Sequence, residues 1–343
     1  MDLFKSLNEN ADYSHASLQL ILGAWVLSSL FEEKEKVALD TGDVSEDDYD
    51  KQSVYSLLYA LYRSMGEVRS DTGTRYEFTF NTWGYAWPKE WGPCPTTADD
   101  PQRFGKNAYA GLFHFAPLQE MVRARDGAVH IVELGCGTGA GAHYVCKSVL
   151  PKATYTAVDM QLAAIRTCQR KFVPELRGRL TALHANATKL PLPAGSADIV
   201  AVCETHVTEH AGKVTAEDQA FLSKAHDLLK PGGYMVWGNA IPDSTWEPSF
   251  EYLKSIGLRR VESADVTEQA VEARDLDRGR ISAYVAQCIE RFKAFRIPYL
   301  GRKKETAARL ALENFARNPG TNLYVNMQKR TDTYRVSLLE KVA

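Results

Sequence analysis

The stretch from His130 to Met160 constrains the fold of this 343-residue chain more than any other part. It opens with His130–Leu134, an alternating segment rich in β-branched residues, which is typical of a buried strand. A turn follows that carries three glycines at alternate positions: Gly135, Gly137 and Gly139. Because glycine has no Cβ atom, a ligand can approach the backbone of such a turn closely.

The residues after the turn extend this pattern. Ala140–Val149 is expected to form a helix whose first N–H groups are free to face an electron-rich ligand. A second strand is expected at Thr154–Val158 and ends in Asp159. In nucleotide sites an acid about 20 residues past the glycines binds ribose hydroxyls. The sequence therefore predicts a nucleoside-binding site.

The identity of the nucleoside is less constrained. Gly135, Gly137 and Ala140 also satisfy the looser dinucleotide pattern, so a nicotinamide-dependent oxidoreductase is an alternative. Glu133 precedes the first glycine by two residues. A carboxylate there would repel a pyrophosphate in a partly dry site, whereas it could bind the amino group of a methionine moiety. This position favours a methionine-containing nucleoside.

Two downstream segments carry a family resemblance. They are NATKLPLPAGSADIVAV at Asn186–Val202 and LLKPGGYMVWG at Leu228–Gly238. With the glycine motif, and in this order, they resemble the class I S-adenosylmethionine-dependent methyltransferases over roughly Val129–Gly238. The resemblance implies an α/β fold with a doubly wound, mostly parallel seven-stranded sheet of the Rossmann-like methyltransferase type. It also implies S-adenosyl-L-methionine as the cofactor.

The same resemblance implies which residues contact the cofactor. The candidates are Glu133, Gly135, Cys136, Gly137, Gly139, Asp159, Met160, Asn186, Ala187 and Cys203. Methyltransferases of this type often place an aspartate after the third strand to hold the adenine amino group. This chain has Asn186 there, and its amide oxygen can still accept a hydrogen bond.

The segment CETHVTEH follows the predicted fourth strand, Ala197–Cys203, and is the candidate catalytic region. In open parallel sheets, ligands bind beyond the carboxyl ends of the strands. Glu204, His206 and His210 are the candidate proton acceptors of this segment, the histidines because an imidazole titrates near neutral pH. Glu209 is a candidate substrate contact. The segment resembles the E-x-(S/T)-x-x-H region of small-molecule methyltransferases, with altered spacing.

Two other interpretations of these histidines stay open. His206 and His210 are four residues apart, so a helix would place both on one face, as in some metal sites. The segment is not HExxH and no further ligand is suitably spaced, so we expect no metal. A structural histidine with its hydrogen bonds satisfied is the other alternative.

Aromatic residues concentrate in YEFTFNTWGYAWPKEW, at Tyr76–Trp91. Aromatic faces can bind a methylsulfonium cation, so four residues of this segment are candidate substrate contacts: Tyr76, Asn81, Trp83 and Tyr85. The last three resemble an N-W-x-Y pattern of phthiotriolone-type methyltransferases, again with altered spacing. A hydrophobic plug between two parts of the chain is the alternative.

Composition excludes several classes. Lys and Arg number 41 against 43 Asp and Glu, a formal net charge of -2, and no basic stripe with interleaved aromatics indicates a nucleic-acid partner. The six cysteines form no CxxC pair, which is typical of reduced thiols in a cytoplasmic protein. The most apolar run, Ser17–Phe31, is too short to span a bilayer comfortably, so we expect no stable membrane span.

The expected organisation has two parts. Residues 1–100 are predicted to form a helical cap, lid or homodimer contact, with helices at Ser17–Phe31 and Ser53–Met65. Residues 101–343 form the cofactor-binding domain, with a helical insertion at about 240–300. The family usually ends its sheet with an antiparallel hairpin, for which Thr321–Gln328 and Tyr334–Leu339 are the candidates because both alternate.

The sequence thus favours transfer of a methyl group from S-adenosylmethionine to a small, hydrophobic acceptor. Within the class, the chain resembles small-molecule methyltransferases of the phthiotriolone, tocopherol and sterol type. The acceptor atom, whether oxygen, nitrogen, carbon or sulfur, is open. A NAD(P)-dependent oxidoreductase and a non-catalytic nucleoside-binding module are the alternatives.

Overall fold

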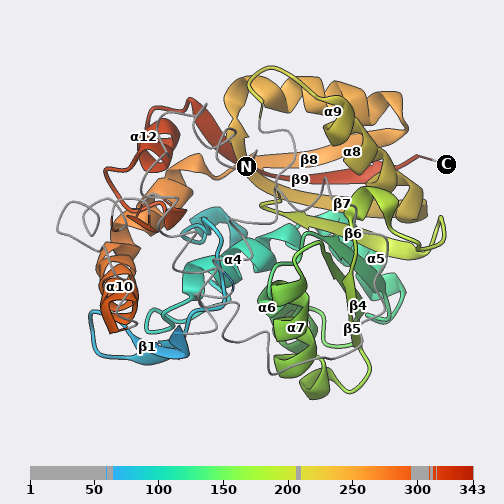
Figure 1. Cartoon of the computed structure of the whole chain (residues 1–343). Coiled ribbons are helices and arrows are strands. Elements are labelled where there is room, and N and C mark those ends of the chain that lie inside the picture. The colour runs from blue at the N-terminus through green and yellow to red at the C-terminus, as the bar shows by residue number, and fades with distance from the viewer. Residues whose placement is uncertain are drawn as a thin grey trace, which may run out of the picture. The chain divides into compact units, whose positions relative to one another are not determined.

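The computed structural model describes residues 59, 65–205, 210–294, 309, 312, 313 and 315–342 (Figure 1). These residues belong to two compact units. The sheet unit contains the described residues from Phe80 to Ala273 and from Asn326 onward. The hairpin unit contains the described residues up to Thr79 and from Arg274 to Val325. The predicted helices at 17–31 and 53–65 lie outside the described residues, apart from Tyr59 and Met65.

The sheet unit is built on a seven-stranded sheet in the order β5-β4-β3-β6-β7-β9-β8 (Figure 1). The strands are β3 (His130–Leu134), β4 (Thr154–Asp159), β5 (Leu180–His184), β6 (Ala197–Cys203), β7 (Leu229–Pro242), β8 (Leu258–Asp265) and β9 (Asp332–Lys341). The first five run parallel, and β9 pairs antiparallel with both β7 and β8. The predicted doubly wound, mostly parallel fold is confirmed.

Helices cover both faces of this sheet. Those that begin in the sheet unit are α4 (Arg103–Leu112), α5 (Ala116–Ala124), α6 (Ala140–Tyr144), α7 (Leu162–Lys171), α8 (Ala216–Leu228), α9 (Trp246–Ser255) and α10 (Thr267–Ala294). A π-helix, η2 (Val145–Val149), follows α6 directly, and the short 3-10 helices are η1 (Lys89–Trp91), η3 (Pro174–Leu176), η4 (Ala187–Lys189) and η5 (Asp243–Thr245). Among the described residues, none of the helices combines the length and the apolar character needed to cross a bilayer.

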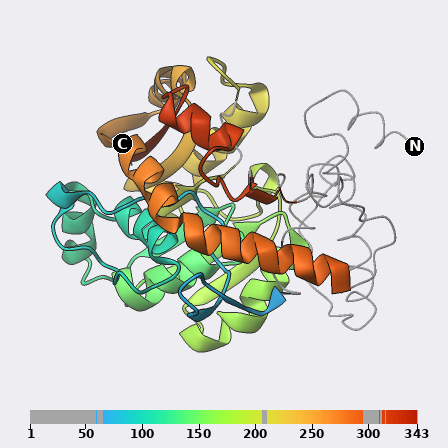
Figure 2. The same cartoon turned by 90° about the vertical axis from the view of Figure 1, so that its left-hand side faces the viewer.

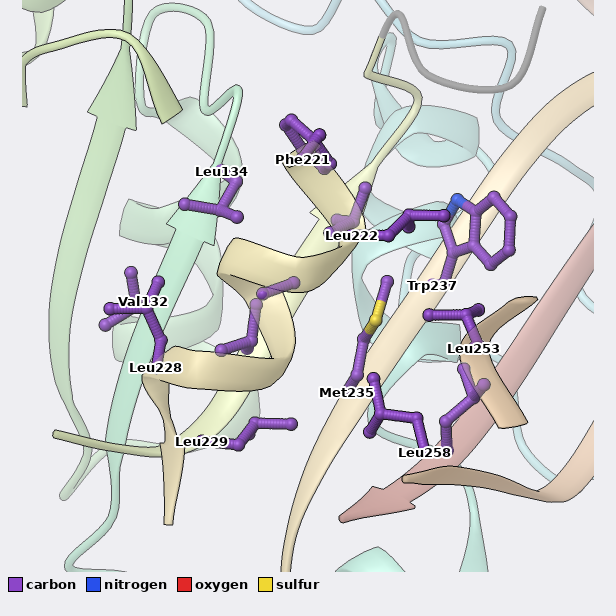
Figure 3. Close-up of a cluster of buried hydrophobic side chains, with 14 of the residues drawn as sticks. Val132, Leu134, Phe221, Leu222, Leu228, Leu229, Met235, Trp237, Leu253 and Leu258 are labelled. Carbon is purple, nitrogen blue, oxygen red and sulfur yellow. The ribbon is translucent and has the colours of Figure 1, made fainter. Parts of the chain in front are cut away.

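One face of the sheet packs against α8 and α9 in a large apolar core (Figure 3). Val132 and Leu134 of β3 contribute to this core, together with Phe221 and Leu222 of α8. Successive strand residues point to opposite faces, so Glu133 points to the other face, where α4 and α6 lie against each other. The apolar face therefore fixes the sheet, and the opposite face carries Glu133 of β3.

The hairpin unit contains β1 (Glu67–Arg69) and β2 (Arg75–Glu77), which pack on α10 from Arg274 onward, the long orange helix in Figure 2. Phe78 stacks on Tyr284 of α10, with ring centroids 4.3 Å apart. The side-chain amide of Gln287 exchanges two hydrogen bonds with the backbone of Arg69, at 2.9 and 2.7 Å. These contacts give the hairpin an apolar and a polar attachment to the same helix.

The predicted C-terminal hairpin is half wrong. Tyr334–Leu339 lies in β9 as expected, but the segment at 321–328 forms α12 (Asn322–Gln328) instead of a strand. Tyr324 and Met327 are its buried residues, and a spacing of three places both on one side of a helix. The outer partner of β9 is β8, which sequence reasoning missed.

We expect Trp246→Ala to destabilise the sheet unit by about 3–5 kcal/mol, because a buried aromatic truncated to alanine loses its burial and leaves a cavity. Trp246 is fully buried, and its ring centroid lies 4.8 Å from that of Trp237 and 5.7 Å from that of Phe250. Urea unfolding would measure the change. Leu276→Ala, at a side chain that is 59% exposed, is the control. A loss below about 1 kcal/mol for Trp246→Ala would contradict this description of the core.

Candidate active site

The glycine turn follows β3 at the point where the order of the sheet reverses. β3 has β4 on one side and β6 on the other, and all three run parallel. Open α/β sheets bind ligands at such a switch point, outside the carboxyl ends of the strands. Gly135 and Gly139 have φ values of 83° and 80°, a backbone region that other residues rarely adopt.

Close packing adds a second requirement for glycine at these two positions. A Cβ on Gly135 would lie 2.5 Å from Oγ1 of Thr205, and one on Gly139 would lie 2.3 Å from Sγ of Cys168. Thr205 follows β6, and Cys168 belongs to α7. The turn is therefore held between the end of β6 and the helix that follows β4.

Asp159 at the end of β4 ties the turn to the next helix. Its Oδ2 accepts a hydrogen bond from the Gly137 N–H at 2.8 Å, and its Oδ1 accepts one from the Gln161 N–H at 2.7 Å. Burial raises the pKa of this carboxyl to about 6, although both backbone hydrogen bonds act in the opposite direction. An ionised carboxylate has about four acceptor positions, so Asp159 retains capacity for further donors.

Glu133 is held by two tyrosines that sequence reasoning missed. The Tyr109 hydroxyl of α4 donates to Oε1 at 2.9 Å, and the Tyr155 hydroxyl of β4 donates to Oε2 at 3.0 Å. The Glu133 side chain is fully buried, and this burial raises its pKa to about 7. To bind Glu133, a ligand amine would have to donate a third hydrogen bond to a carboxylate that has no exposed surface. The predicted contact of Glu133 with the cofactor stays a prediction.

The β3–β4 register contains the signal that could have found Tyr155. Ile131 pairs with Tyr155 and Glu133 pairs with Ala157, so Tyr155 lies diagonally opposite Glu133 on the same face. Tyr109 has no such local signal, because its helix reaches the sheet through tertiary packing alone.

The other predicted cofactor residues lie near the ends of β3, β4, β5 and β6. The side-chain oxygen of Asn186 accepts from both the N–H and the hydroxyl of Thr188, each at 2.9 Å. Cys136 and Cys203 are buried, and Met160 and Ala187 are half-buried. The contacts of these residues with a cofactor stay predictions.

His184, at the end of β5, is another residue that sequence reasoning missed. Its Nε2 lies 3.0 Å from the carbonyl oxygen of Met160, so this nitrogen donates. Burial lowers the pKa of the ring, which favours the neutral form. The side chain thereby fixes the residue that follows Asp159.

The predicted catalytic segment is only partly within the described residues. His206 and Glu209 lie outside them. His210 is exposed, and its carbonyl oxygen accepts hydrogen bonds from the Lys213 N–H and the Thr245 hydroxyl, both at 3.0 Å. Across the described ranges, no group of three His, Cys, Asp or Glu side chains could hold a metal ion.

The carboxylate of Glu204 contacts the backbone of the aromatic segment. Its carboxylate accepts from the N–H of Trp83 at 2.6 Å and from the N–H of Gly84 at 3.3 Å. The Tyr334 hydroxyl of β9, another contact missed from the sequence, donates to it at 2.9 Å. The structure thus brings one predicted proton acceptor together with the backbone of Trp83, one of the predicted substrate contacts.

The aromatic residues themselves are largely enclosed. Trp83 and Tyr85 are buried and Asn81 is half-buried. Tyr76 belongs to the hairpin unit, where its hydroxyl lies 3.1 Å from Arg280. The plug interpretation and the roles of all four residues in substrate binding stay predictions.

Comparison with known proteins identifies the core of this site. Residues 131–233 match the family described as "Methyltransferase domain". Over these residues the chain is similar to methyltransferase domains. The matched range contains the glycine turn, Asp159 and Glu204, so the predicted methyltransferase activity agrees with the family match.

Relatives and a solved structure extend the comparison. The chain is 26% identical over 218 residues to phthiotriol/phenolphthiotriol dimycocerosates methyltransferase of Mycobacterium leprae, covering 61% of this chain and 74% of that protein. It is 27% identical over 166 residues to the fatty-acid O-methyltransferase of Mycolicibacterium smegmatis, covering 48% and 54% respectively. The crystal structure of the [4+2]-cyclase SpnF superposes with a TM-score of 0.53 at 15% identity, covering 90% of this chain and 100% of that one. At this identity the superposition supports the fold alone.

The buried carboxyl of Glu133 predicts a pH dependence. Its pKa is about 7 in the folded state against 4.5 for the ordinary group, so its ionisation opposes folding. Stability should therefore fall as pH rises from about 4.5 to about 7 and then level off. Glu133→Gln removes this contribution, so its stability relative to the wild type should rise between pH 5 and pH 8.

Urea unfolding at both pH values would measure this difference, with Glu120→Gln as the control because Glu120 is exposed on α5. A stability difference between Glu133→Gln and the wild type that is the same at both pH values would contradict the assignment.

Proposed function

We propose that this methyltransferase uses S-adenosylmethionine and transfers its methyl group to a small, apolar acceptor. The observation that carries the cofactor assignment is the pair formed by the glycine turn and Asp159 at the switch point of the sheet. The turn allows close approach of a ligand, and the carboxylate has acceptor positions left for two ribose hydroxyls. These features fit a nucleoside.

S-adenosylmethionine, when bound, supplies an electrophilic methyl group on a sulfonium ion. The residues of the chain then have three tasks: to bind the nucleoside, to align the acceptor and to exclude water. Alignment of two reactants provides much of the acceleration in such a displacement. An acceptor that must lose a proton also needs a base, for which His206 and His210 are the proposed candidates.

The proposed acceptor class rests on two observations. The relatives are named for lipid substrates, namely phthiotriol dimycocerosates and fatty acids. The chain has a net charge of -2, which does not favour binding to a nucleic-acid backbone. Incubation with methyl-deuterated S-adenosylmethionine and oleic acid as the probe, followed by mass spectrometry, would test a fatty acyl acceptor. A labelled methyl ester is the expected product, and its absence would contradict fatty acyl carboxylates as acceptors.

Titration calorimetry separates this proposal from the oxidoreductase alternative. We expect S-adenosylhomocysteine to bind and NAD to show no binding heat. The reverse result would overturn the proposal, because the same glycine turn and Asp159 would then serve a dinucleotide.

Asp159→Ala should weaken binding of S-adenosylhomocysteine by about 1.5–3 kcal/mol for each hydrogen bond to the ribose that is lost. Asp159→Asn should weaken it less, because the amide oxygen can still accept. Asp126→Asn is the control: the Asp126 side chain is 92% exposed, and its φ of 51° is one that asparagine tolerates. Equal affinity of Asp159→Ala and the wild type in calorimetry would contradict the role of this carboxylate.

A further inference from the structure

Glu204 has a left-handed backbone conformation at the carboxyl end of β6. It follows β6 directly and has a φ of 47°, in the left-handed region that L-residues with long side chains rarely adopt. Its N–H donates to the carbonyl oxygen of Gly238 in β7 at 2.8 Å. A strained conformation persists only where surrounding contacts determine it, and such residues cluster at functional sites.

The side chain of Glu204 joins segments that are far apart in sequence. Trp83 and Gly84 donate through their backbone N–H groups, and Tyr334 donates through its hydroxyl from β9. Both carboxylate oxygens therefore accept hydrogen bonds. A proton taken up on either oxygen would compete with these donors, which disfavours Glu204 as the proton acceptor.

The segment that Glu204 holds is fixed on its other sides as well. The N–H of Tyr85 donates to the carbonyl oxygen of Phe104 in α4 at 3.4 Å. A Cβ on Gly84 would lie 2.4 Å from the backbone of Phe104, so the backbone at Gly84 is in close contact with α4. The N–H of Ala86 donates to the carbonyl oxygen of Gln269 at 2.9 Å. Residues 83–86 thus run between α4, the start of α10 and the end of β6.

Thr205, the residue after Glu204, contacts the end of β3 next to the glycine turn. The Thr205 hydroxyl donates to the carbonyl oxygen of Leu134 at 2.8 Å, directly before the glycine turn. The Asn239 side chain in turn donates to the carbonyl oxygen of Thr205 at 2.9 Å. Glu204 and Thr205 therefore lie between the glycine turn and residues 83–86.

We propose that Glu204 is a positioning residue: its carboxylate fixes residues 83–86 against the carboxyl end of the sheet, beside the glycine turn. The backbone strain at Glu204 directs the carboxylate toward Trp83 and Gly84 while Thr205 remains on the turn. This assignment rests on the proposed function, because it gives the segment a fixed place next to the cofactor.

Hydrogen–deuterium exchange of the peptide that covers residues 80–87 tests the proposal, because it reports the two N–H groups directly. In Glu204→Gln an amide group replaces one acceptor oxygen, and exchange of this peptide should accelerate roughly 10–100-fold, the range for loss of a charge-assisted hydrogen bond. Tyr334→Phe keeps the ring and removes one donor, so it should accelerate exchange in the same peptide by a smaller factor.

Two matched controls accompany these variants. Glu340→Gln changes a carboxylate on the same strand as Tyr334 but opposite Tyr234, away from the carboxyl end of β7. Tyr252→Phe removes a hydroxyl that bonds to Ser223 and Gln219 on α8. Both should leave exchange of residues 80–87 unchanged. Wild-type exchange in Glu204→Gln and Tyr334→Phe would overturn the proposal.

Calorimetry with S-adenosylhomocysteine on the same proteins separates this inference from the proposed function. Under the proposal, Glu204→Gln still binds S-adenosylhomocysteine, because Asp159 and the glycines are unchanged. Absence of binding to the wild-type protein would overturn the proposed function, whereas the exchange result would still decide whether Glu204 holds the segment. If Glu204→Gln loses methyl transfer while residues 80–87 exchange as fast as in the wild type, Glu204 transfers a proton directly, and the positioning role is overturned.

Discussion

The reversal of strand order between β3 and β6 is the constraint on which the site depends. The chain turns to opposite sides after these neighbouring parallel strands, so their carboxyl ends leave room between the outgoing segments. One outgoing segment is the glycine turn, and the other begins with Glu204 and Thr205. The hydroxyl of Thr205 bonds to the last residue of β3 and joins the two. The glycine turn and the aromatic segment are therefore both attached at the carboxyl ends of β3 and β6.

The face of the sheet that carries Glu133 also carries Asp159, and each of these two buried carboxyls has its own partners. Glu133 accepts from two tyrosine hydroxyls, whereas Asp159 accepts from two backbone N–H groups. Burial raises the pKa of both, because a charge in a dry environment is poorly solvated. Hydrogen bonds offset only part of this cost. Buried acids with perturbed pKa values are common at functional sites, which agrees with the location of this pair beside the turn.

Local patterns predict most of the fold and the positions of the glycine turn and Asp159. The strands at 130–134, 154–158 and 197–203, the glycine turn and Asp159 are all specified by residues close in sequence. The contacts of Glu204 with Trp83 and Tyr334 join residues 121 and 130 positions apart, so no periodicity reveals them. The alternation at residues 321–328 predicts a strand, but the structure has a helix there. The buried residues, Tyr324 and Met327, are three apart, and this spacing fits one side of a helix. Local sequence patterns therefore place the candidate residues on their strands and turns, but they do not reveal the tertiary partners of these residues.

A crystal structure of the protein with S-adenosylhomocysteine tests the central claim most directly. The account predicts the ribose hydroxyls within hydrogen-bond distance of the Asp159 carboxylate, and the nucleoside next to the glycine turn. The sulfur should then face the space beyond the ends of β3 and β6. A nucleoside bound elsewhere, or bound with its ribose away from Asp159, would contradict the account.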